Sequence, residues 1–210
     1  MRPICVTAIL AAAIAAPAIL FGCASAPPDA ETSAKAAAVM KASFHEQGQA
    51  KLDRLDQDDT QKICSEYSGK APPKDVAERI EKANLATIKW PADGKLVGDW
   101  KQGEKIAQEG RGMQYSDDPK APAGANCYAC HQLAPEELSF GTIGPSLYKF
   151  GRTRGYTDEM RKYTYGKIYN PEAYSACTNM PRFGHKGILT EKQITDIVAL
   201  LMDPASPVNK

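Results

Sequence analysis

The sequence predicts an all-α fold, because two of its stretches repeat apolar residues at helical intervals and helix-capping signals accompany them. The apolar positions are Val76, Ile80, Ala83 and Ile88 in the first stretch, and Ile194, Ile197, Val198, Leu201 and Met202 in the second. Thr190 to Gln193 has the form of a capping box at the start of the second stretch, and Pro204 ends it. Asp99 is placed to cap a further helix, over about residues 100–107.

The first 22 residues have the pattern of a secretory signal peptide. Met1 and Arg2 form a short positive region, an almost unbroken run of Ala, Ile, Leu and Val covers 4–20, and small residues follow. An N-terminal membrane anchor is the weaker alternative, because the run is Ala-rich and interrupted by Pro17, whereas a spanning helix needs about 20 apolar residues. We therefore expect an exported, periplasmic protein.

Two positions compete for the cleavage of this signal. Leu20 to Cys23 resembles the lipobox of bacterial lipoproteins, in which the cysteine is lipidated and becomes the new N-terminus. Ala24 to Ala26 fits the small-residue rule of ordinary cleavage, but Pro27 would then begin the mature chain. The lipobox is favoured, so we predict that Cys23 is lipidated and tethers the protein to a membrane.

The next part of the chain divides into a tether and a helical extension. Residues 23–38 are small, polar and proline-containing, and they predict a flexible tether. Residues 39–97 predict two helices, one reaching about residue 67 and one beginning after Pro73. Such an extension serves either as additional packing or as a partner-binding surface.

The most specific motif is Cys127-Tyr128-Ala129-Cys130-His131, the C-x-x-C-H pattern of c-type haem attachment. The two thiols can form thioethers with the two vinyl groups of one porphyrin, and the histidine is then held under the iron as its proximal ligand. A redox-active cysteine pair has no need of the histidine, and a zinc site would need a second ligand pair at similar spacing. The motif therefore predicts one covalently attached haem c.

Two other segments predict the surroundings of the iron. Gly144-Pro145-Ser146-Leu147 is a G-P-x-L turn, in which the carbonyl of Pro145 would accept the Nδ1 proton of His131 and strengthen Nε2 as a donor. Together with the helix after Asp99 and the closing helix, this turn is typical of a class I cytochrome c fold, here over 98–205.

Met180 is the predicted sixth ligand, in a loop rich in proline and glycine just ahead of the last helix. A thioether favours ferrous iron and raises the reduction potential relative to a bis-histidine site. His185 is the competing ligand, although a loop or surface role is favoured for it. His45 is a weaker candidate still.

The remaining cysteines predict a disulfide. Of six cysteines, Cys5 lies in the signal, Cys23 is the predicted lipid site and two belong to the haem motif, which leaves Cys64 and Cys177. Two such cysteines in an oxidising compartment most often pair. The alternative is that Cys177 is a free thiol or an iron ligand.

Charge and composition give little indication of other chemistry. The chain has 26 basic against 25 acidic side chains, so nucleic acid is not an expected partner. No nucleophile and base constellation is evident, and a haem iron ligated on both faces has no open position for substrate. Catalysis by the isolated chain is therefore not predicted.

A set of motifs in 98–205 resembles the SoxX family, the monohaem subunits of the SoxAX cytochromes of bacterial thiosulfate oxidation. These motifs are Gly144 to Tyr148, Phe150-Gly151 with Arg154-Gly155, Ile168 to Pro171, Asn179 to Gly184, and Leu189 to Glu191. The set is much more specific than the haem pentapeptide alone.

The resemblance implies a heterodimer with a SoxA-like haem subunit that carries a cysteine persulfide, in an L-cysteine S-thiosulfotransferase complex. Thiosulfate is joined oxidatively to a cysteine of a SoxYZ-like carrier, and electrons leave to an acceptor cytochrome. The present chain would relay electrons through a haem ligated by His131 and Met180. The alternatives are a free-standing class I electron carrier and a catalytic haem protein, such as a peroxidase, in which Met180 leaves the iron.

Overall fold

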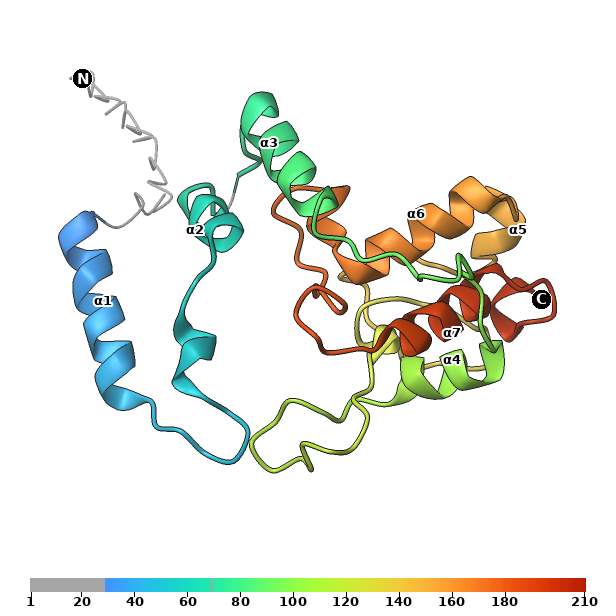
Figure 1. Ribbon diagram of the computed structural model, residues 1–210, viewed down its shortest axis with the longest axis horizontal. Helices are drawn as coiled ribbons and strands as arrows, with labels where there is room; N and C mark the ends of the chain where they lie inside the picture. Colours follow the sequence, from blue (N-terminus) through green and yellow to red (C-terminus); the bar gives the residue numbers. More distant parts are fainter. Residues whose placement is uncertain (1–28, 69) are drawn as a thin grey trace, which may run out of the picture.

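The computed structural model describes residues 29–68 and 70–210, and there it consists of helices joined by loops (Figure 1). Its α-helices are α1 (Ala30–Ser43), α2 (Asp59–Glu66), α3 (Lys74–Leu85), α4 (Trp100–Gln108), α5 (Phe150–Arg154), α6 (Asp158–Tyr169) and α7 (Glu191–Met202). Short 3-10 turns are η1 (Leu52–Leu55), η2 (Cys127–Ala129), η3 (Pro171–Ala173) and η4 (Pro207–Asn209). The predicted all-α class is confirmed. The predicted signal peptide and Cys23 lie outside the described residues.

Helix α7 forms the centre of the core, and every residue from Ile194 to Met202 is buried. Helix α4 packs along it at close range, as Figure 1 shows. A Cβ on Gly103 of α4 would lie 2.1 Å from the carbonyl oxygen of Asp196, so glycine permits this approach. The backbone N–H of Gly98 also donates to the carbonyl of Thr195 at 2.9 Å. The first and last helices of the domain are therefore joined by backbone contact as well as by apolar packing.

Both predicted helix caps are present. The Asp99 carboxylate accepts a hydrogen bond from the N–H of Lys101 at 2.9 Å at the start of α4. Thr190 and Gln193 form a reciprocal capping box on α7. These caps satisfy backbone donors that have no partner inside the helix. Local sequence signals therefore set the start of both central helices.

The domain extends beyond the predicted end at residue 205. In η4, Val208 is fully buried, and its carbonyl accepts a hydrogen bond from the N–H of Lys149 at 2.7 Å. The Asn209 side chain donates to the carbonyl of Leu201 at 3.0 Å. Pro204 does end α7, but the chain then folds back and completes the core.

The extension differs from its prediction in the first half. Helix α1 occupies part of the segment expected to be a tether, and Asp29 caps it by accepting from the N–H of Thr32 at 2.7 Å. None of its residues is buried, so its alanine-rich sequence and this cap account for it better than packing does. The single helix expected up to residue 67 is divided, because the chain turns at Gly48, where φ is +53°.

Candidate haem-binding site

The C-x-x-C-H motif lies on the single turn η2 and the residues after it. The carbonyl of Cys127 accepts from the N–H of Cys130 at 3.1 Å and from that of His131 at 2.9 Å. Both cysteines of the motif are free thiols. Burial raises the pKa of the Cys127 thiol to about 12, whereas the thiols of redox-active pairs have lowered pKa values. The turn therefore holds two free thiols and an imidazole within five consecutive residues.

His131 makes the contact that the G-P-x-L motif predicts. Its Nδ1 lies 2.7 Å from the carbonyl oxygen of Pro145. A carbonyl can only accept, so the proton resides on Nδ1 and the lone pair of Nε2 is free for a metal. A Cβ on Gly144 would lie 2.1 Å from Cε1 of His131, so the turn touches the imidazole directly.

Met180 lies in the loop between η3 and α7, partly buried against the hydrophobic core. The loop is anchored to the end of α6: the N–H groups of Gly184 and His185 both donate to the carbonyl of Tyr169, each at 3.0 Å. A Cβ on Gly184 would lie 2.3 Å from the Tyr169 ring. Phe183 is buried in the same region, with 8% of its surface exposed. The candidate sixth ligand thus belongs to a packed loop.

His185 is hydrogen-bonded to the helical extension. Its Nδ1 lies 3.2 Å from the hydroxyl of Thr87, which follows α3. Partial burial, with the nearby charges of Arg182 and Lys186, lowers the pKa of His185, so the ring is neutral at pH 7. The structure thus places His185 in the same loop as Met180, in contact with the residue that follows α3 by two positions.

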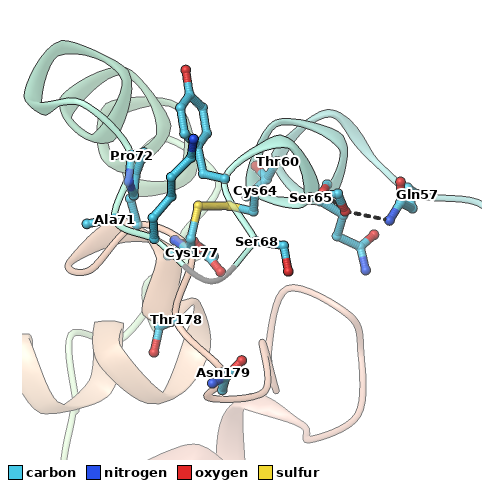
Figure 2. Close-up of a pocket in the computed structure, with 15 residues that line it drawn as sticks. Gln57, Thr60, Cys64, Ser65, Ser68, Ala71, Pro72, Cys177, Thr178 and Asn179 are labelled. Atoms are coloured by element: carbon cyan, nitrogen blue, oxygen red, sulfur yellow. Dashed lines mark hydrogen bonds between the residues drawn. A yellow bond between two sulfur atoms is a disulfide. The ribbon is translucent and has the colours of Figure 1, made fainter. Parts of the chain in front are cut away.

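Cys64 and Cys177 are joined by a disulfide, across 113 residues of sequence. Figure 2 shows it connecting α2 to the segment that continues through Thr178 and Asn179 toward Met180. Cys177 has a left-handed backbone, with φ +60°, and its N–H donates to the carboxylate of Glu172 at 2.7 Å. A surface cavity of about 680 Å³ lies beside the bond and includes no residue of the C-x-x-C-H motif.

Asp58, which the sequence analysis missed, binds two cations of the Met180 loop. Its carboxylate accepts from Arg182 at 2.6 Å and from Lys186 at 2.8 Å. It also caps α2 by accepting from the N–H of Gln61 at 3.0 Å. Partial burial opposes ionisation of Asp58, but the hydrogen bonds from both cations outweigh it and hold the pKa of the carboxyl well below its usual 3.8. Asp58 and Arg182 are 124 residues apart in the sequence, so no local pattern could indicate their contact.

The residues present fit a covalently held haem. They provide two free thiols, an imidazole whose Nδ1 contacts a backbone carbonyl, and a thioether on a packed loop. Leu138 and Ile143, between the haem motif and Pro145, are 87% and 76% exposed.

Two features are absent from the part of the chain that the structure describes. Within residues 29–68 and 70–210, no three His, Cys, Asp or Glu side chains gather as a metal site would require. No helix in that same part is both long and apolar enough to cross a membrane.

Comparison with known proteins identifies one domain of the chain and one relative. The Cytochrome c family model matches residues 116–203. An uncharacterized lipoprotein of Aquifex aeolicus (strain VF5) is 45% identical over 158 residues, which are 73% of each chain. The residues that the family model matches include the C-x-x-C-H motif, the G-P-x-L turn and Met180. The chain therefore contains a Cytochrome c domain, which supports an electron-transfer role and implies covalently bound haem c.

Proposed function

We propose that this chain is the electron-relay subunit of a complex that couples thiosulfate oxidatively to a carrier-protein cysteine. It holds one haem c, attached through Cys127 and Cys130 and ligated by His131 and Met180. Its main partner is a SoxA-like haem subunit, which binds the substrate. Contact with a SoxYZ-like carrier and with an acceptor cytochrome is transient.

One observation carries this proposal: two of the motifs that resemble the SoxX family contact each other. Ile168 to Pro171 ends α6, and Asn179 to Gly184 forms the candidate ligand loop. Tyr169 of the first motif accepts hydrogen bonds from the loop and packs against Gly184 of the second. The resemblance is therefore to one structural unit around the sixth ligand, beyond the pattern common to c-type cytochromes.

The chemistry requires an electron outlet. Joining the outer sulfur of thiosulfate to a cysteine thiolate, RS⁻ + SSO₃²⁻ → RSSSO₃⁻ + 2e⁻, forms one S–S bond and releases two electrons. When bound, the haem takes up and passes on one electron at a time. The Pro145 carbonyl keeps the proton of His131 on Nδ1, and the neutral thioether of Met180 favours the reduced state.

The protein is also proposed to be exported and lipid-anchored through Cys23. The Aquifex relative, which shares 73% of its length with this chain, is named a lipoprotein. The lipobox-like Leu20 to Cys23 provides the attachment site. Mass analysis of the mature N-terminus checks this: we expect a diacylglyceryl cysteine at residue 23, and an unmodified N-terminus at a later residue would contradict it.

Co-purification tests the proposed complex. The native protein, isolated under mild conditions, is expected to bring a second haem subunit with it, and a deletion strain is expected to lose thiosulfate oxidation. Recovery of this chain alone, with thiosulfate oxidation unchanged in the deletion strain, would instead support a free-standing electron carrier.

The axial ligands are tested by a pair of variants. Met180→Ala is expected to abolish the weak red absorption band of methionine-ligated ferric haem and to lower the reduction potential, because the thioether donor is lost. His185→Ala is the matched control from the same loop, and it should change neither. If His185→Ala rather than Met180→Ala alters the spectrum, the assignment of the sixth ligand is wrong.

A further inference from the structure

The helical extension contacts the candidate ligand loop on both sides of Met180. Three residues before it, Cys177 is bonded to Cys64 of α2. Two residues after it, Arg182 is held by Asp58, and Lys186 binds the same carboxylate. Arg182 has only 9% of its side chain exposed, so this ion pair is largely shielded from water.

Both of these attachments come from one short helix. Asp58 is the N-cap of α2 and Cys64 lies within it. Helix α2 has no buried residue, and it contributes nothing to the hydrophobic core. Its attachment to the rest of the protein rests on the disulfide, the ion pairs and a hydrogen bond of 3.0 Å from Asn84 to Thr60. Filling the core therefore does not explain its position.

Helix α3 adds polar contacts to the same loop. The side chain of Asn170, fully buried at the start of the segment, donates to Oδ1 of Asn84 at 2.9 Å and to the hydroxyl of Thr87 at 3.0 Å. Glu81 accepts from the N–H of Ala176 at 3.2 Å. The segment from Asn170 to Lys186 is thus held by the extension at its beginning, its middle and its end.

A methionine ligand needs such support. The sulfur is a weak, neutral donor, and the loop that carries it gains conformational entropy when it leaves the iron. Attachments on both sides of Met180 reduce that gain in entropy, because they restrict the loop when Met180 has left the iron as much as when it is bound. The fraction of molecules with an open iron position therefore falls.

We propose that α2 and α3 form a brace that positions Met180 on the haem iron, and that Asp58 and Cys64 are its positioning residues. Asp58 acts through Arg182 and Lys186, and Cys64 acts through Cys177. This inference rests on the proposed ligation by Met180. The brace would give the extension a role in setting the reduction potential of the haem and in keeping outside ligands from the iron.

Imidazole binding to the purified ferric holoprotein tests the brace. The apparent affinity of an outside ligand rises in proportion to the population of open iron. Asp58→Asn removes the charge but keeps a good helix cap, and Cys64→Ser with Cys177→Ser removes the bond. Asp58→Asn is expected to strengthen imidazole binding by about tenfold, since hydrogen bonds to charged groups contribute on that order. The double serine variant should also strengthen it, and both proteins should have a lower reduction potential.

Matched variants separate positioning from general damage. Asp59→Asn changes the next acidic residue, whose side chain is 96% exposed, and it should leave imidazole affinity and potential at wild-type values. Asp58→Glu should restore most of the wild-type affinity. If the double serine variant fails to fold, Lys186→Gln provides a milder test, with a smaller increase in imidazole affinity expected.

Met180→Ala distinguishes failure of the brace from failure of the ligand assignment. If this variant keeps the red absorption band, Met180 is not the ligand and the proposed function needs revision. If it loses the band while Asp58→Asn and the double serine variant bind imidazole as the wild type does, the brace is overturned. Tighter imidazole binding in these variants, with Asp59→Asn unchanged, supports it.

Discussion

At the scale of single residues, His131 depends on a neighbour that lies close along the chain, whereas Asp58 binds partners that lie far from it. The contact between His131 and Pro145 follows from a short motif, and the structure contains it at 2.7 Å. Asp99 and Thr190 cap their helices as predicted. Asp58 was missed, because its partners in the Met180 loop are distant in sequence and its own surroundings, rich in charge, look like an ordinary exposed segment.

Gly144 provides a test of the proximal contact. In Gly144→Ala the new Cβ would lie 2.1 Å from the His131 ring, so the turn or the imidazole must move. We expect a loss of about 1–3 kcal/mol in the free energy of unfolding and a changed potential, measured by denaturant titration and redox titration of the holoprotein. Gly110→Ala is the control, since its Cβ meets only the end of a side chain at 3.2 Å. Equal behaviour of the two variants would contradict the tight packing at Gly144.

Asp58 also predicts a pH dependence of stability. The pKa of its carboxyl is lower in the folded protein than the ordinary 3.8, so the ion pairs stabilise the fold fully above that value, and this contribution declines as pH falls from there toward the lower pKa of the folded protein. Wild type should therefore exceed Asp58→Asn in unfolding free energy at neutral pH, and the difference should shrink toward about pH 3. Urea unfolding at several pH values measures it. A constant difference across this range would show that Asp58 acts through something other than its charge.

At the scale of elements, predictions held where apolar periodicity and capping agreed. Helix α7 has both an apolar face and a capping box, and it buries that face. Helix α3 buries Val76 and Ile80 but begins after Pro73 without a side-chain cap, and α4 begins at the predicted Asp99 cap. The segment 39–67 has apolar residues without a core to bury them, and it divides into turns and short helices instead. Helix α1 forms without burying an apolar face. Its composition and its N-cap favour a helix only weakly, because most helical stability in proteins comes from packing.

Helix α1 therefore predicts a small effect of truncation. A chain that begins at residue 45 loses a helix with no buried residue, whose ion pair with the rest of the extension, between Lys41 and Asp56, is highly exposed. Exposed pairs contribute little, so we expect the free energy of unfolding to change by less than about 0.5 kcal/mol. Thermal unfolding followed at the haem Soret band measures this. A clear drop in stability would indicate that α1 packs more firmly than its exposure implies.

At the scale of the whole molecule, the helical extension and the cytochrome domain could each be predicted, but most contacts between them could not. Local patterns indicated a helical extension and a cytochrome domain, but contacts such as Asn84 with Asn170 join residues 86 apart and leave no periodic signal. The pairing of Cys64 with Cys177 is the exception, because counting cysteines in an oxidising compartment is independent of their separation. That bond was the one clue that the extension reaches the ligand loop.

The disulfide therefore predicts how the two regions unfold. It closes a segment of 113 residues, and a cross-link of this kind restricts the unfolded chain. Removing it in the Cys64→Ser, Cys177→Ser protein is expected to cost about 2–5 kcal/mol. Because α2 has no buried residue, the extension should then lose its helicity at lower urea concentration than the domain loses its haem environment. Far-UV circular dichroism and Soret absorption, measured on the same samples, should give coincident transitions in the wild type and separate ones in the variant. Coincident transitions in both proteins would mean that α3 alone joins the extension to the cytochrome core.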